Sequence, residues 1–186
     1  MNAASQHSQS LHPLVTAIPG LKVAMPSTPA DAKGLLATAI RDDDPVIFFE
    51  HKTLYTISGD VPDDEYLVPF GKARIVSEGN DCTLVATGRM VSFCENAAQA
   101  LAEDGITCDI IDPRTTSPLD EDAILDSVEK TGRLVVVDET PPRCSFAADI
   151  AALAAGEVFS SLKAPVRQIT GPHSPVPFAK ELEGEF

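Results

Sequence analysis

The chain has 186 residues and a net charge of −14, and 44% of its residues are hydrophobic although only 5% are aromatic. This length fits one large domain or two small ones, and an aliphatic core is typical of α/β proteins. The acidic charge argues against a nucleic-acid ligand, because the phosphate backbone would be repelled. No apolar stretch approaches the ~18 residues that cross a bilayer and no signal peptide is recognisable, so we expect a cytoplasmic protein without a membrane partner.

The first 55 residues predict two helices and two strands. Ser27 or Thr28 can cap the second helix, whose first turn holds Pro29. The second strand is a continuous apolar run, as expected of a strand buried on both faces. The predicted ranges are 10–18 (helix), 21–26 (strand), 27–40 (helix) and 46–49 (strand). Alternation then stops among glycines, prolines and acids, and we interpret residues 56–70 as a linker.

Residues 71–186 alternate strands with helices more regularly. This order implies parallel strands joined by right-handed crossovers in a three-layer α/β/α domain with a mostly parallel sheet. The expected strands are 72–76, at an edge, 82–87, 107–112, 133–138 and 165–170; the expected helices are 90–103, 118–130 and 145–155.

Four cysteines occur without a CxxC or zinc-ribbon spacing. We interpret them as small core residues in a reducing compartment. They are Cys82, Cys94, Cys108 and Cys144.

His7, in the run Gln6-His7-Ser8-Gln9, is the leading catalytic candidate. Imidazole titrates nearest neutrality, so it can donate and accept a proton during turnover. Taken alone, the pattern around His7 favours the alternative, a surface histidine in a frayed terminus. The other three histidines show no metal-ligand spacing, and we interpret them as structural or exposed; they are His12, His51 and His173.

Polar residues also follow the predicted strands of the second block. Ligands of open parallel sheets bind at the carboxyl ends of strands, which here carry Gly88-Arg89, Asp112-Pro113-Arg114 and Asp138-Glu139. The turn Arg41-Asp42-Asp43-Asp44 is either a cation site or a solvated helix end. No phosphate-loop, dinucleotide, nucleophile-elbow or zinc-protease motif occurs.

Many short motifs, taken in order, are less generic than these patterns. Together they resemble the β subunit of the thiamine-diphosphate-dependent E1 component of 2-oxo acid dehydrogenase complexes. They are Gln6-His7-Ser8-Gln9, Pro26-Ser27-Thr28-Pro29 and residues 18–23, 31–36, 39–42, 69–73, 117–120, 129–135 and 176–178. Within that family, several stretches are closest to the acetoin dehydrogenase branch; they are Lys52-Thr53-Leu54-Tyr55, Pro142-Arg143-Cys144-Ser145 and residues 111–114, 149–150 and 172–178.

The resemblance implies a two-domain fold. Residues 1–55 would be the C-terminal part of a transketolase-like pyrimidine-binding domain, and residues 71–186 a transketolase C-terminal-like domain. We expect an N-terminally truncated subunit, because the family's pyrimidine-binding glutamate finds no counterpart here. The chain alone is therefore expected to be inactive, and it offers no cofactor-binding residue of its own.

The resemblance also implies a function. The intact subunit would take part in carbon–carbon cleavage of acetoin and acyl transfer to lipoyl-E2. Alternatives are a pyruvate or branched-chain 2-oxo acid E1 β subunit, and a non-catalytic assembly or E2-docking fragment. The expected partners are an E1 α subunit in an α2β2 assembly and the peripheral-subunit-binding domain of E2.

Site residues carried over from the family are few. His7 corresponds to the active-site histidine near the thiazolium, which assists acyl transfer to lipoamide. Thiamine diphosphate and magnesium would be bound together with the α subunit. The loop that holds potassium in some members corresponds to Ala39, Ile40, Asp42 and Asp44.

Overall fold

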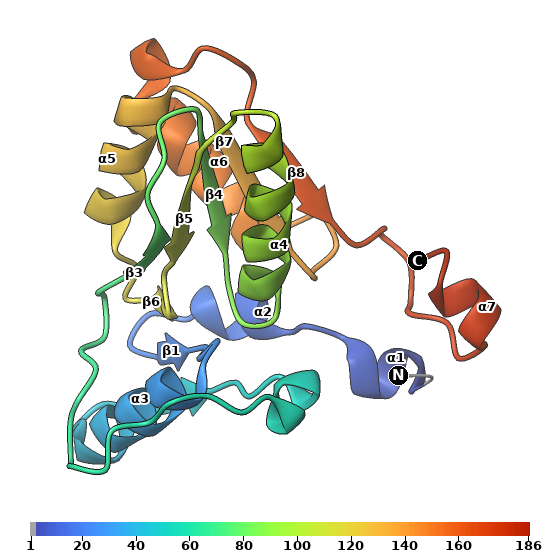
Figure 1. Ribbon diagram of the computed structural model, residues 1–186. Helices are drawn as coiled ribbons and strands as arrows, with labels where there is room; N and C mark the ends of the chain where they lie inside the picture. The colour runs from blue at the N-terminus through green and yellow to red at the C-terminus, as the bar shows by residue number, and fades with distance from the viewer. Residues whose placement is uncertain (1–2) are drawn as a thin grey trace.

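A computed structural model describes residues 3–186. It shows two parts, each with its own sheet, which we call the two layers of the molecule (Figure 1). The larger sheet has the order β3-β5-β4-β7-β8. β3 is antiparallel to β5, and the other neighbours are parallel. The predicted edge strand and mostly parallel sheet are thus confirmed. The strands are β3 (Arg74–Ser77), β4 (Cys82–Ala86), β5 (Cys108–Asp112), β7 (Leu134–Asp138) and β8 (Arg167–Thr170).

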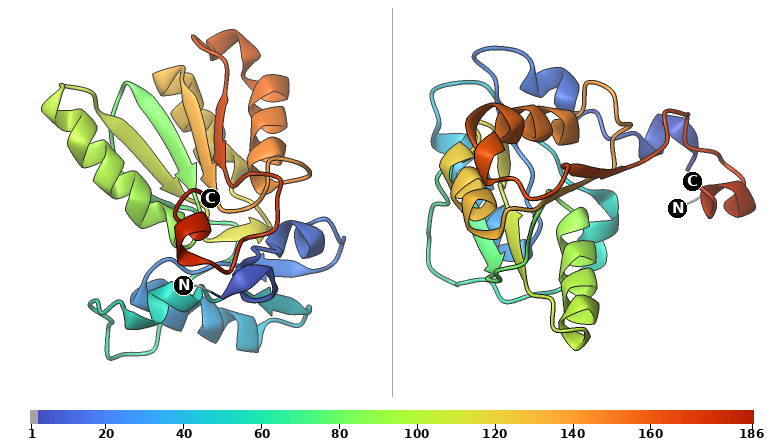
Figure 2. Two further views of the ribbon diagram at one scale, coloured as in Figure 1. Left: turned by 90° about the vertical axis from the view of Figure 1, so that its right-hand side faces the viewer. Right: turned by 90° about the horizontal axis from the view of Figure 1, so that it is seen from above.

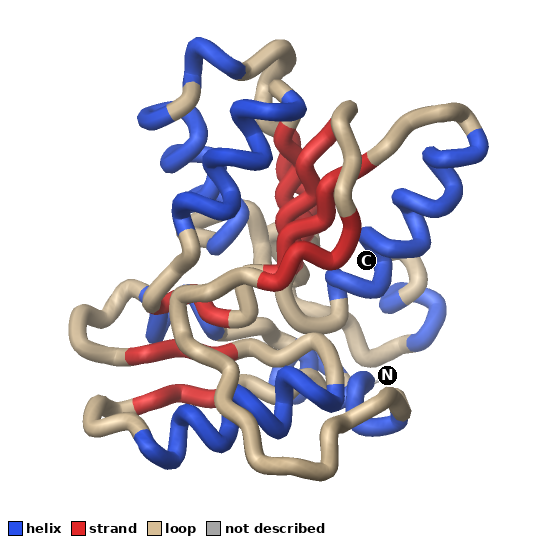
Figure 3. The backbone as a smooth tube through the Cα atoms, turned by 60° about the vertical axis from the view of Figure 1, so that its left-hand side comes forward, coloured by secondary structure: helices blue, strands red, loops and turns tan. Residues whose placement is uncertain are grey.

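Helices cover both faces of the large sheet, as the alternation of its side chains requires. On β4, Leu84 and Ala86 join the cluster beneath α4 (Met90–Glu103). The intervening Val85 joins the cluster beneath α5 (Glu121–Thr131) and α6 (Phe146–Glu157). Successive strand residues point to opposite faces, so one strand serves two cores. The expected three-layer α/β/α arrangement is visible in Figure 3.

The smaller sheet combines strands from distant parts of the chain. β1 (Lys22–Ala24) pairs in parallel with β2 (Val46–Phe48) and antiparallel with β6 (Thr115–Ser117). β6 comes from the same block of sequence as the large sheet. The C-terminal block of the sequence therefore supplies one strand of the small sheet.

Helices of the N-terminal layer surround this small sheet. α3 (Pro29–Arg41) is capped by Thr28, whose hydroxyl oxygen accepts from the Asp31 N–H at 3.0 Å, as predicted. The remaining helical elements are α1 (Ala4–Ser8), α2 (His12–Thr16), the 3₁₀ turns η1 (Lys52–Thr56) and η2 (Phe159–Ser161), and α7 (Lys180–Glu183). α1 and α7 lie side by side, so the two ends of the described chain meet (Figures 1 and 2).

Residues 57–70 run along α3. The Tyr66 hydroxyl donates to the Ala30 carbonyl at 2.6 Å, and the Thr38 hydroxyl donates to the Val68 carbonyl at 2.7 Å. At Gly34, a Cβ would lie 2.5 Å from the Val68 side chain. Glycine is therefore needed where this segment crosses α3. Between residues 3 and 186, no helix combines the length and apolarity that crossing a membrane requires.

A buried cluster of charges joins the two layers. Asp31 of α3 lies 3.0 Å from Arg114 Nε and 3.4 Å from Arg74 Nε. These contacts are ionic, because neither Nε meets the geometry of a hydrogen bond. Asp112, fully buried at the end of β5, accepts from Ser27 Oγ and lies 3.3 Å from Arg74 Nη2. Burial raises the pKa of Asp112, against the opposing effects of the Ser27 hydrogen bond and the Arg74 charge.

Removing one member of this cluster leaves a buried charge without its partner. We expect Asp31→Asn to lower the free energy of unfolding by about 3 kcal/mol, as is typical of a broken buried ion pair. The matched control is Glu65→Gln, which breaks the exposed pair between Arg41 and Glu65 and should cost less than about 1 kcal/mol. Urea unfolding of both variants measures the difference. Equal losses would contradict a structural role for the buried cluster.

Candidate active site

A cavity of about 470 Å³ lies between the small sheet and the carboxyl edge of the large sheet. The N-terminal layer contributes residues from α1, α2 and the segment after β2. The large sheet contributes the ends of β7 and β8 and the loop after β4. Much of the wall comes from residues 7–12, 49–53, 87–90, 137–139 and 169–171.

Two of the three predicted strand-end motifs meet at this cavity. Gly88-Arg89 and Asp138-Glu139 line it together, as the rule for parallel sheets predicts. Asp112-Pro113-Arg114 does not line it, because the charges of Asp112 and Arg114 are engaged in the interlayer cluster. Two of the three strand-end loops therefore lie at one cavity, and the third lies at the contact between the layers.

His51 and Glu139 meet across the cavity wall. His51 Nε2 lies 2.8 Å from Glu139 Oε2. The backbone N–H of Thr53 donates to His51 Nδ1 at 3.2 Å. Nδ1 is therefore unprotonated, which leaves Nε2 as the donor to the carboxylate. The pair ties the beginning of η1 to the end of β7.

His12 makes a second, more deeply buried pair with the neighbouring acid. Its side chain is 2% exposed, and Nε2 lies 3.7 Å from Asp138 Oδ1. This distance is too long for a hydrogen bond, so the contact is electrostatic. Burial lowers the pKa of His12, and the negative charges of Asp138 and Glu139 only partly oppose this effect. His12 is therefore neutral at pH 7.

The partners of this second pair are held in place by other contacts. The rings of Phe49 and Phe146 each stand edge-on to His12 with their centroids 6.3 Å away. Asp138 accepts hydrogen bonds from the backbone N–H of Thr140, at 3.2 Å, and from its hydroxyl. His12 thus lies where α2, β2, β7 and α6 meet.

His7, the leading candidate of the sequence, lies on α1 at the mouth of the same cavity. It is exposed, and Gln6 Nε2 lies 3.4 Å from its Nε2. The adjacent Ser8 Oγ is buried and has no hydrogen-bond partner among the described residues. An exposed imidazole beside an unpaired hydroxyl offers groups that can contact a ligand entering the cavity.

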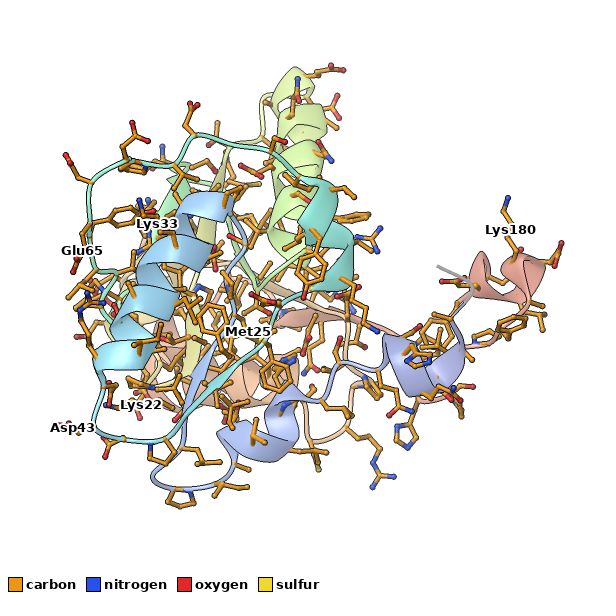
Figure 4. All side chains as sticks on the ribbon, turned by 90° about the horizontal axis from the view of Figure 1, so that it is seen from below. Lys22, Met25, Lys33, Asp43, Glu65 and Lys180 are labelled. Atoms are coloured by element: carbon orange, nitrogen blue, oxygen red, sulfur yellow. The ribbon has the colours of Figure 1, made fainter. Side chains whose placement is uncertain are left out.

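The acidic turn after α3 lies elsewhere, with Lys22 and Asp43 together at that end of the helix (Figure 4). Lys22 Nζ donates to both carboxylate oxygens of Asp42, at 2.7 and 2.8 Å, and lies 3.0 Å from Asp44 Oδ2. The Lys22 hydrogen bond lowers the pKa of Asp42. An ammonium of the chain itself therefore supplies a positive charge to these carboxylates.

Sequence reasoning missed two residues of the cavity. His12 and His51 were interpreted as structural or exposed, but each faces an acid at the end of β7. A signal for His51 was available, because Glu50-His51 directly follows a predicted buried strand. No comparable signal marks His12, since its partner lies in a distant part of the sequence.

None of the four cysteines lines the cavity. Burial raises the pKa of Cys82 to about 11 and that of Cys94 to about 12, so neither is a thiolate at neutral pH. Cys108 is buried, as predicted for a core residue. For Cys144 the core interpretation is wrong, because the loop after β7 leaves it exposed.

Known families match both layers. The model described as the transketolase pyrimidine-binding domain matches residues 1–58, and the one described as the transketolase C-terminal domain matches residues 71–186.

Two curated relatives are similar over nearly the whole chain. The acetoin:2,6-dichlorophenolindophenol oxidoreductase subunit beta of Bacillus subtilis (strain 168) is 57% identical, over 99% of this chain and 54% of its own length. The pyruvate dehydrogenase E1 component subunit beta of the same organism is 46% identical, over 94% of this chain and 54% of its own length. The chain thus spans about half the length of the curated relatives it matches.

Among solved structures, a split-gene transketolase described as an inactive β4 tetramer is similar in fold. Its TM-score is 0.71 at 21% identity, over 85% of this chain and 50% of that one.

The buried His12 gives the folded chain a dependence on pH. The unfolded chain takes up a proton at this histidine near pH 6.5, whereas the folded chain resists it until a lower pH. We therefore expect stability to fall as the pH drops below about 6.5. His12→Gln should weaken this fall, while His173→Gln, at an exposed site, should not. Urea unfolding at several pH values tests this, and an unchanged slope in His12→Gln would contradict it.

Proposed function

The chain belongs to the transketolase family, with a pyrimidine-binding and a C-terminal domain, and we propose from this premise that it serves in the E1 β subunit of an acetoin dehydrogenase complex. The observation that carries the proposal is the 57% identity to an acetoin oxidoreductase β subunit over 99% of this chain. The lower identity of 46% to a pyruvate dehydrogenase β subunit supports acetoin over pyruvate as the substrate.

Thiamine diphosphate supplies the electron sink for carbon–carbon cleavage in this chemistry. The contribution of this chain is the edge of the cavity, where His7 would exchange a proton as the acyl group passes to the lipoyl arm of E2. The buried Ser8 Oγ, with no partner among the described residues, fits a site that accepts a further polar group.

Magnesium and the diphosphate are assigned to a partner. Within residues 3–186, no group of three or more His, Cys, Asp or Glu side chains is arranged to hold a metal ion. From the likeness to E1 β subunits, we propose that an α subunit supplies these ligands in an α2β2 assembly. The net charge of −14 suits contact with a basic binding domain of E2 in the cytoplasm.

Replacing His7 tests its proposed role. In the complex assembled from the intact β subunit, we expect His7→Ala to slow acyl transfer to lipoyl-E2 by about 10²-fold, the usual contribution of a general acid or base. Acetoin-dependent reduction of dichlorophenolindophenol should fall less, because a dye acceptor bypasses the lipoyl step. The melting temperature should stay unchanged, since His7 is exposed.

The control for this experiment is His173→Ala, which removes an exposed histidine outside the cavity. It should leave both rates unchanged. Equal loss of dye reduction and lipoyl transfer in His7→Ala would contradict a role specific to the transfer. Reduction of the dye with pyruvate but not with acetoin would favour the alternative 2-oxo acid substrate.

We also propose a potassium ion at the turn after α3, bound through carbonyls near Ala39 and Ile40 together with Asp42 and Asp44. Because Lys22 already pairs with both carboxylates, the carbonyl oxygens would have to supply most of the selectivity. We expect a higher melting temperature in potassium chloride than in sodium chloride at equal ionic strength. Identical melting curves in the two salts would contradict this site.

A further inference from the structure

His12 is a polar side chain in a buried, largely apolar environment. It is 2% exposed, edge-on to Phe49 and Phe146, and its Nε2 has no hydrogen-bond partner among the described residues. Burying an imidazole under these conditions costs free energy. The charged group nearest to Nε2 is the carboxylate of Asp138, 3.7 Å away, which Thr140 holds in a fixed orientation.

The contact joins the two layers at the place where α2 begins. His12 is the first residue of α2, and Asp138 is the last residue of β7 in the large sheet. The other end of α2 is fixed by Thr16, whose hydroxyl lies 2.6 Å from that of Thr116 in β6. Both ends of this short helix are therefore attached to the C-terminal block of the chain.

His7 depends on this attachment. α1 buries no residue of its own, so its position follows from where the connecting residues 9–11 enter α2 and from the neighbouring α7. Residues 7–12 form a continuous part of the cavity wall, from His7 at the mouth to His12 in the interior. A shift of His12 at the fixed end of this segment would move His7 at its other end.

We propose that His12, through its contact with Asp138, is a positioning residue for His7. The end of β7 thereby sets where the proton-exchanging imidazole stands at the mouth of the cavity. This inference rests on the function proposed above, because it concerns the same site. His12 itself stays neutral, buried and out of contact with the substrate.

Four variants separate this role from packing. His12→Phe keeps an aromatic ring between Phe49 and Phe146 but removes the polar edge. Asp138→Asn removes the charge and keeps the shape. His12→Gln keeps a polar group that can approach Asp138. The double variant His12→Phe/Asp138→Asn completes a double-mutant cycle.

The first measurement needs no catalysis. In the full chain, the imidazole carbon–proton NMR signal of His7 should move toward its unfolded-chain position in His12→Phe and in Asp138→Asn. It should stay near its wild-type position in His12→Gln. His51→Gln, which breaks the neighbouring pair with Glu139, is the matched control and should leave the His7 signal in place.

The second measurement uses the complex assembled from the intact subunit. His12→Phe and Asp138→Asn should each lower kcat for acyl transfer to lipoyl-E2 by about tenfold or more, the usual effect of a small misplacement. KM for acetoin should not change. The double variant should be no slower than either single variant, because both remove one contact.

The possible results test the positioning of His7 and the proposed function separately. An unmoved His7 signal in both His12→Phe and Asp138→Asn overturns the proposal, as does additive loss in the double variant. If His12→Phe does not fold, the signal in Asp138→Asn decides. A wild-type complex without acetoin activity overturns the proposed function, whereas the NMR result still judges the positioning of His7.

Discussion

Two aspartates and two arginines share one buried contact between the layers, and the geometry of the cavity depends on it. Asp31 comes from α3 and Asp112 from the end of β5, while Arg74 and Arg114 flank them from the large-sheet side. Two negative and two positive side chains face one another here, so removal of one member leaves a charge without its partner. A rotation of one sheet against the other would separate these charges, and it would also open the wall between β2 and β7. The cluster thus acts as the fixed support of the candidate site.

The pairs His12–Asp138 and His51–Glu139 cross the same junction. Asp138 and Glu139 are adjacent at the end of β7, and they face two histidines from different parts of the N-terminal layer. One pair is buried and the other is partly exposed to solvent. These titratable groups gather at the interface between the two layers rather than on a single element. At an interface, polar contacts can control how the layers are placed relative to each other.

Local sequence patterns predicted the longer elements, because their causes are local, but they did not predict α1, β6 or α7. The Thr28 cap, the Pro29 first turn and the apolar face of 82–87 each act within a few residues. The cavity was predicted only in part, because its pairs join residues far apart along the chain. The acidic turn shows the same limit. Its contact with Lys22 from the neighbouring strand could not be inferred from the turn itself, and the potassium site stays a proposal. His7 was selected from a motif and through the family resemblance, and its catalytic role stays a prediction.

The strand β6 restricts how this fold can be recombined. It belongs to the C-terminal block by sequence, yet it completes the small sheet by pairing with β1 across an irregular register. A chimera that takes its C-terminal domain from one relative and its N-terminal layer from another must match this register as well as the cavity. A crossover in the segment before residue 71 would separate the two blocks of sequence, but it would also divide a single hydrogen-bonded sheet.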